Sequence, residues 1–262
     1  MEFQDHLGWG LLFCLLSGSF SLVGAVLLFK ARFNLVGYTW VVGFSSGALV
    51  YTALAVLLIE AQAGLIGFLG ENPGRWAAGL GFFLGLFSMV LLDRLVPSGQ
   101  NPHQARNLTD PMSFTPTRRQ GIFMVLSMGG HSFPEGIALL VSTLFDPWLG
   151  LALAIALGLH NLAEGATLSR PLQAATGSSD QTLVLIGLTG LAEVIGAVLA
   201  YFVLIHYLPA SVLGFMLALS SGFLVFVAFD SLLSASQLPQ NRRIMLYATL
   251  SGFAAFGIIQ FF

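Results

Sequence analysis

The chain has 262 residues, of which 56% are hydrophobic and only 8% are charged, and its mean hydropathy is +0.86. Soluble domains carry about a quarter charged residues, so this composition excludes a solvated globular protein and indicates a polytopic membrane protein. The net charge of −2 excludes no partner by itself, but the single cysteine, Cys14, excludes an intrachain disulfide and a metal site built from cysteines.

Eight apolar segments approach the length of about 20 residues that a helix needs to cross a bilayer. The first follows two acidic residues, Glu2 and Asp5, whereas a cleaved signal peptide would carry basic residues there, so we expect a retained span. The segments are residues 7–29, 35–59, 76–93, 121–142, 148–169, 181–205, 211–233 and 244–262. The sequence therefore predicts an all-α polytopic membrane protein whose residues 1–262 form one transmembrane domain.

The longest connection, residues 94–120, is rich in Pro, Asn and Thr and lacks apolar periodicity, so it is predicted to be a loop. Basic residues fall almost entirely on the side of this loop, and Arg75 alone falls on the other side. The positive-inside rule then places the loop in the cytoplasm and both termini outside. The basic residues on the loop side are Lys30, Arg32, Arg94, Arg106, Arg118, Arg119, Arg170, Arg242 and Arg243.

An internal similarity links the second and seventh spans. The segment SSGALVY at residues 45–51 matches SSGFLVF at residues 220–226. These spans cross the membrane in opposite directions, so the match favours an inverted repeat in which spans 1–3 mirror spans 6–8 around the central pair. Packing motifs of small residues also recur in unrelated membrane helices, and that alternative stays open.

Several ionisable residues lie near the middle of predicted spans, where an unpaired charge costs several kcal/mol. His131 and Glu135 are four residues apart on one span, and His160 and Glu164 repeat this spacing on the next span, so each pair shares a helical face. Glu193 lies at a similar depth on the sixth span. Three further acidic residues lie nearer the ends of spans and are candidate pathway residues: Asp230, Asp93 and Glu60.

The chemistry of this set favours a cation site. Imidazole and carboxylate ligands without a thiolate suit Zn²⁺, Fe²⁺, Mn²⁺, Co²⁺ or Cd²⁺. Ser132 and Asn161 lie three residues before Glu135 and Glu164, so each carboxylate has a polar neighbour and could bridge two ions. Pro134 removes a backbone hydrogen bond beside these ligands. The alternative is that the polar pairs only hold helices together.

Two motifs on consecutive spans, HSFPEG at 131–136 and HNLAEG at 160–165, resemble the His-Asn-x-Pro-Glu-Gly motifs of the ZIP (Zrt-, Irt-like) divalent metal transporters, in their bacterial form. LAEVIGA at 191–197 resembles the Glu-containing sixth helix of that family, and LLDRLVP at 91–97 resembles the end of its third helix. The number of spans, the outside termini and the long loop also fit, so the resemblance covers the whole chain.

The resemblance implies eight helices in a 3+2+3 arrangement around a binuclear metal site, and an elevator-like motion of helices 1, 4, 5 and 6. Homodimers are common in the family. By position, the metal ligands would be His131, Glu135, His160, Glu164, Asn161 and Glu193, with Ser132 beside them. The chain departs from the family pattern in three places. Ser132 stands in place of an Asn, Ala163 stands in place of a Pro, and the loop carries one histidine, His103, where many members of the family have a His-rich tract.

The sequence thus predicts a transporter, not an enzyme, that moves Zn²⁺ or a related divalent ion toward the cytoplasm across the plasma or inner membrane. The expected partners are divalent metal ions, the lipid bilayer and a second copy of the chain, with no nucleic acid and no prosthetic group. The alternative is an intramembrane metal-dependent hydrolase, although the HExxH motif is absent. A retinal-type photoreceptor is excluded because the only lysine, Lys30, lies at a loop, and no phosphate-binding loop supports an ATP-driven pump.

Overall fold

The computed structural model describes residues 6–30, 35–95, 117–207, 210–236 and 242–259. Within these ranges the chain forms eight helical rods and no strand, which confirms the all-α prediction. Most of the predicted loop 94–120 lies outside the described residues, and so does its histidine, His103. The helices are α2 (Leu7–Lys30), α3 (Leu35–Tyr51), η1 (Thr52–Leu57), α4 (Leu58–Leu69), α5 (Glu71–Leu95), α7 (Arg118–Phe145), α8 (Pro147–Thr176), α9 (Ser179–Tyr207), α10 (Ala210–Ser236) and α11 (Arg242–Ile259).

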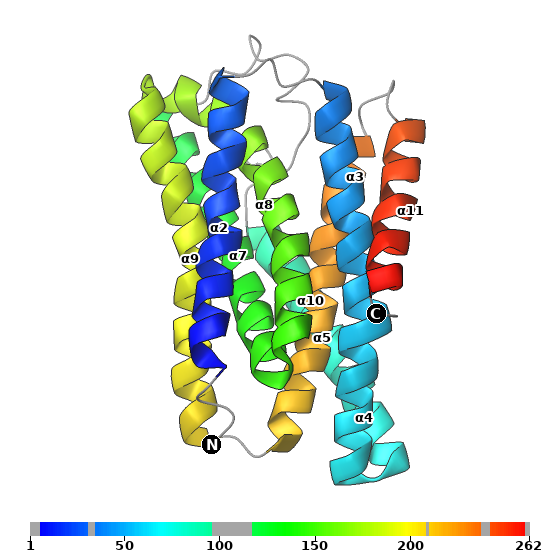
Figure 1. Cartoon of the computed structure of the whole chain (residues 1–262). Coiled ribbons are helices and arrows are strands. Elements are labelled where there is room, and N and C mark those ends of the chain that lie inside the picture. The colour runs from blue at the N-terminus through cyan, green and yellow to red at the C-terminus, as the bar shows by residue number, and fades with distance from the viewer. Residues whose placement is uncertain (1–5, 31–34, 96–116, 208–209, 237–241, 260–262) are drawn as a thin grey trace.

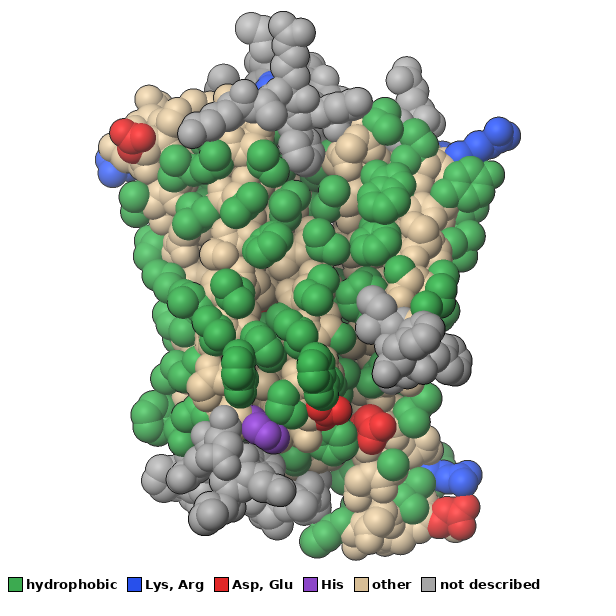
Figure 2. Space-filling model, viewed as in Figure 1, with side chains coloured by type: hydrophobic (Ala, Val, Ile, Leu, Met, Phe, Trp, Pro, Cys, Tyr) green, Lys and Arg blue, Asp and Glu red, His purple; other side chains and the backbone are tan. Residues whose placement is uncertain are grey.

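Seven of the described helices are long and apolar enough to span a membrane. The eighth rod, α11, has 18 described residues and begins with two arginines, and it is not among those seven. Hydrophobic side chains cover the flank of the bundle in Figure 2, and the charged side chains lie near its two ends. This is the surface that a protein embedded in lipid needs, because the bilayer interior offers no partner for a charge.

Local sequence explains where the central helices begin and end. Thr117 forms a capping box with Gln120 at the start of α7, accepting a hydrogen bond from its backbone N–H. Asp146 caps α8 through the N–H of Trp148, and Pro147 occupies the first turn, where its missing N–H costs nothing. Gly177 ends α8 at φ 69°, a left-handed conformation that favours glycine.

The second rod is longer than predicted. α3, the π-helical segment η1 and α4 run on without a break, so the helix that was expected to end at residue 59 continues to Leu69. The 34 residues of its span Val36–Leu69 correspond to about 51 Å of helix, against a hydrocarbon core of about 30 Å. α4 and the first turns of α5 therefore reach beyond the other helices at one end of the bundle (Figure 1).

The helices pack as two groups of four. The first group is α2, α7, α8 and α9, and the second group is the α3–α4 rod, α5, α10 and α11 (Figure 1). The two groups meet mainly along two seams, one between α3 and α8 and the other between α7 and α10. The 3+2+3 grouping along the chain stays a prediction.

Glycines make the closest helix contacts, and these contacts occur in matching pairs. A Cβ atom at Gly47 of α3 would overlap the Thr249 carbonyl oxygen of α11, and one at Gly222 of α10 would overlap the Phe82 carbonyl oxygen of α5. Gly47 and Gly222 are the glycines of the two matching SSG segments. The same pattern joins α2 to α8 and α9 to α7. These contacts fit both an inverted repeat and recurring packing motifs of small residues, and the inverted repeat stays a prediction.

Candidate metal centre

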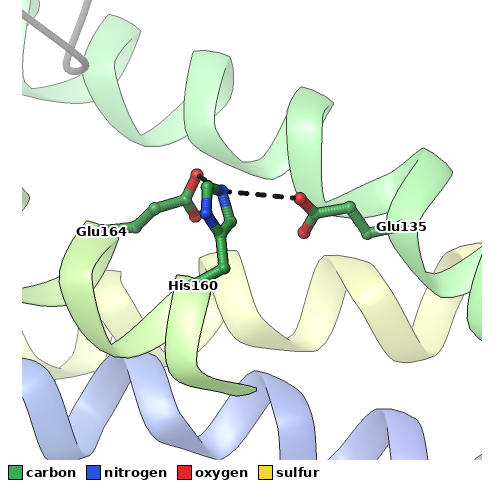
Figure 3. Close-up of side chains that lie close together, drawn as sticks. All are labelled: Glu135, His160 and Glu164. Carbon is green, nitrogen blue, oxygen red and sulfur yellow. Dashed lines mark hydrogen bonds and ion pairs between the residues drawn. The ribbon is translucent and has the colours of Figure 1, made fainter. Parts of the chain in front are cut away.

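Glu135 of α7 and His160 and Glu164 of α8 come together inside the first group (Figure 3). Each contributes one ligand atom, and these atoms all lie within 4.8 Å of one another. His160 Nε2 is 3.1 Å from Glu164 Oε1 and 3.9 Å from Glu135 Oε1. The three side chains are buried, with Glu135 and His160 almost fully enclosed. Three of the four members of the two i,i+4 pairs thus come together, and His131 lies outside the group.

The spacing and the chemistry of this group suit a divalent cation. Ligand atoms around an ion at bond lengths of about 2.0–2.2 Å lie roughly 3–4 Å apart. Neither oxygen of Glu135 accepts a hydrogen bond from the described residues. A buried carboxylate without a donor is costly, and a cation would offset that cost. One imidazole and two carboxylates form a ligand set of the borderline-to-hard type.

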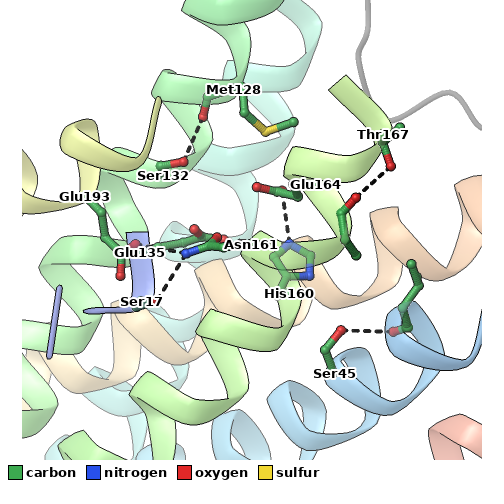
Figure 4. A network of polar contacts seen from close by, with 12 residues as sticks. Ser17, Ser45, Met128, Ser132, Glu135, His160, Asn161, Glu164, Thr167 and Glu193 are labelled. Atoms are coloured by element: carbon green, nitrogen blue, oxygen red, sulfur yellow. Dashed lines mark hydrogen bonds and ion pairs between the residues drawn. The ribbon is translucent and has the colours of Figure 1, made fainter. Parts of the chain in front are cut away.

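A second polar cluster lies beside this group and joins three helices. Asn161 of α8 donates from Nδ2 to Ser17 Oγ of α2 at 3.1 Å and to Glu193 Oε2 of α9 at 3.0 Å (Figure 4). All three residues are buried. Both hydrogens of the amide nitrogen are thus used, while Asn161 Oδ1 and Glu193 Oε1 have no hydrogen-bond partner among the described residues.

Replacing Asn161 with Ala should destabilise the protein by about 1–3 kcal/mol, because Glu193 would lose its amide donor while remaining buried. The measurement is the thermal unfolding midpoint of the purified chain. Gln173 offers a matched control, since its side-chain amide forms a single exposed hydrogen bond to Ser179, and Gln173→Ala should leave the midpoint unchanged. Equal midpoints for Asn161→Ala and the wild type would contradict the structural role of this amide.

The remaining predicted ligands of α7 lie nearby but outside the three-atom group. His131 is buried one turn before Glu135, and its ring centroid lies 6.4 Å from that of Phe226 on α10. Ser132 is also buried, and its hydroxyl donates to the Met128 carbonyl oxygen of its own helix at 3.1 Å. Pro134 lies within α7, which continues as one helix on both sides of it.

The three candidate pathway residues are spread over the second group. Glu60 lies in the first turn of α4, Asp93 near the end of α5, and Asp230 in the last third of α10. All three are half-buried, and none belongs to a described group of ligand atoms. The structure therefore does not join them to the site.

Ser17 is the residue that the sequence did not single out. It contacts the site from α2, a helix for which no ligand was predicted. A serine in an apolar span is a weak signal, because small polar residues also serve helix packing. In the structure Ser17 lies one residue before Gly18, whose backbone closely approaches Gly190 of α9.

Comparison with known proteins yields one consistent result. A family model described as "ZIP Zinc transporter" matches residues 97–260. A protein named "Zinc transporter ZupT" from Akkermansia muciniphila is 35% identical over 90% of both chains. The protein of that name from Oceanobacillus iheyensis is 32% identical over 97% of this chain and 98% of its own, and that from Lysinibacillus sphaericus is 34% identical over 90% of both.

Proposed function

The chain belongs to the ZIP zinc transporter family and is an integral membrane protein, and from this premise we propose that it carries Zn²⁺ across the membrane through the site between α7 and α8. The buried group of Glu135, His160 and Glu164 is the observation that carries the proposal. Like its relatives, the chain is a divalent metal transporter and not an enzyme. Fe²⁺, Mn²⁺, Co²⁺ and Cd²⁺ are further candidate substrates, because the same ligand types bind them.

In this proposal Glu135, His160 and Glu164 bind the ion, and His131 supplies a fourth ligand from the preceding turn of α7. These ligands suit transport, since carboxylates and a neutral imidazole replace the water around the ion without the strong bonds of a thiolate cluster.

A second ion would bind beside the first, between Asn161 and Glu193, with Glu135 as the bridge and Ser132 nearby. Two buried oxygen atoms support this part of the proposal. Asn161 Oδ1 and Glu193 Oε1 are buried oxygens without hydrogen-bond donors among the described residues. Ser132 contributes little, because its hydroxyl donates into its own helix and is a weaker ligand than an amide oxygen.

Transport would move the first group, α2, α7, α8 and α9, against the second. The hydrogen bonds of Asn161 support this division, because both of them stay within the first group. The basic residues would mark the cytoplasmic face and so place the loop 94–120 there and both termini outside, with transport toward the cytoplasm. A homodimer in the plasma or inner membrane is the proposed assembly.

Flux measurements in proteoliposomes test the proposed function. Purified protein should give saturable Zn²⁺ uptake that Cd²⁺, Fe²⁺, Mn²⁺ and Co²⁺ inhibit in proportion to their affinity for the site. Empty liposomes provide the baseline. Hydrolysis of a lipid or peptide by the same preparation, with no metal flux, would instead support the intramembrane hydrolase.

A further inference from the structure

The seam between α3 and α8 has a regular register. Tyr38 of α3 shares a hydrogen bond of 2.7 Å with Thr167 Oγ1 of α8. Tyr38 and Val42 also form a buried cluster with Ala163. α3 advances by four residues along this seam while α8 goes back by four, so the two helices are antiparallel and present one face each to the other.

The next step along this register places Ser45 of α3 opposite His160 of α8. Ser45 follows Val42 by three residues, and His160 precedes Ala163 by three, so both belong to the same two helix faces. Both are buried, with exposed fractions of 0% and 1%. Figure 4 shows Ser45 on the side of the His160 ring that faces away from Glu164.

The two ring nitrogens of His160 have different surroundings. Nε2 faces the carboxylates of Glu164 and Glu135, at 3.1 Å and 3.9 Å. Nδ1 is buried and has no hydrogen-bond partner among the described residues. A neutral imidazole that binds a metal through Nε2 carries its hydrogen on Nδ1, and ligating histidines almost always donate that hydrogen to an acceptor.

Ser45 has the free acceptor that this nitrogen requires. Its hydroxyl donates to the Val42 carbonyl oxygen of its own helix at 3.1 Å. The single hydrogen is thereby fixed toward the backbone, and the lone pairs of Oγ remain available. An oxygen in this state can accept a hydrogen bond and cannot compete as a donor.

We propose that ion binding at His160 Nε2 draws His160 Nδ1–H and Ser45 Oγ into a hydrogen bond across the α3–α8 seam. The inference rests on the proposed function, since it requires His160 to be a ligand. Ser45 is then a positioning residue: it fixes the ring through Nδ1 and touches no ion. Because α3 belongs to the second group, this bond also links occupancy of the site to the contact between the two groups.

The test is Zn²⁺ binding by the purified full-length chain, measured by titration calorimetry. Ser45→Ala should raise the Kd for Zn²⁺ by about 10-fold or more. This is the lower end of the loss in metal affinity that follows removal of a hydrogen-bond partner of a ligating histidine. Ser45→Thr, which keeps the hydroxyl, should restore binding. Ser46→Ala is the matched control, because Ser46 is equally buried on the same helix but lies one residue off the seam face, and it should bind as the wild type does.

Thermal unfolding separates positioning from a purely structural role. In the presence of a chelator, Ser45→Ala and the wild type should have the same midpoint, and the rise that Zn²⁺ produces should be smaller in the variant. An unchanged Kd in Ser45→Ala, or an equal loss in Ser45→Ala and Ser46→Ala, would overturn the inference alone. Wild-type binding by His160→Ala would overturn both the inference and the ligand assignment on which it rests.

Discussion

Replacing Glu135 with Ala should reduce Zn²⁺ uptake in proteoliposomes by about 100-fold or more. Loss of a residue that only hydrogen-bonds to a metal ligand already lowers metal affinity or activity by about 10–100-fold, and Glu135 is itself proposed as a ligand. Glu135 is the one member of the three-atom group that comes from α7. Without it, the two remaining members of the group, His160 and Glu164, both lie on α8, and His131 would be the one proposed ligand left on α7. The contact of the ion with α7 would then depend on His131, which lies outside the three-atom group.

Glu71→Ala is the control for this experiment. Glu71 lies at the start of α5 on the projecting end of the bundle, where its exposed carboxylate pairs with Arg75 at 2.9 Å. Exposed ion pairs contribute little, so this variant should transport as the wild type does. Both variants should first be shown to unfold at the wild-type midpoint in the presence of a chelator. Normal uptake by folded Glu135→Ala would remove Glu135 from the site and leave the transport assignment to rest on the family alone.

The fold followed from the sequence wherever hydrophobic length decides the structure. Eight apolar segments correspond to eight helical rods within the described residues. The end of the second rod was predicted poorly for a physical reason. Span length reports the thickness of the bilayer, whereas helix length depends on local propensity and on the next breaking residue, here Gly70 at φ 89°.

The candidate site was predicted in part. Spacing of four residues predicts that His160 and Glu164 share a helical face, and the structure brings both of them together with Glu135 of α7. Spacing does not fix how far one helix is rotated or shifted against the next. His131 therefore lies toward Phe226 of α10 and outside the described group of ligand atoms. The same limit concealed the contact of Ser17 with Asn161, which depends on how α2 packs against α8.

The glycines of the first group set the distance between the site helices. Gly136 directly follows Glu135 on α7, and its backbone approaches the Glu193 carbonyl group of α9. Gly196 of α9 approaches the Phe133 carbonyl group of α7 in the same way. Because both sides of the contact are backbone, neither helix can yield by turning a side chain. The position of Glu193 relative to Glu135 is therefore fixed by two residues that have no side chains.

Gly136→Ala should consequently destabilise the protein by about 3 kcal/mol or more, at or above the upper end of the usual cost of overpacking. A Cβ atom there would overlap the carbonyl oxygen of Glu193 and lie 2.6 Å from its carbonyl carbon, so α7 and α9 would have to separate. The thermal unfolding midpoint of the purified chain measures the loss. Zn²⁺ binding should weaken as well, since the separation displaces the backbone beside Glu135.

Gly79→Ala is the matched control, because a Cβ at that position in the interior of α5 would meet no described atom within 4 Å beyond its own stretch of helix backbone. Alanine favours a helix over glycine by up to about 1 kcal/mol, so this variant should be as stable as the wild type or slightly more so. The same substitution is thus expected to lower stability at Gly136 and to leave it unchanged or raise it at Gly79. This difference separates the effect of the helix–helix contact from the effect of helix propensity. A Gly136→Ala variant with wild-type stability and binding would show that α7 and α9 are not held at this distance, and the position proposed for a second ion between Glu135 and Glu193 would lose its structural basis.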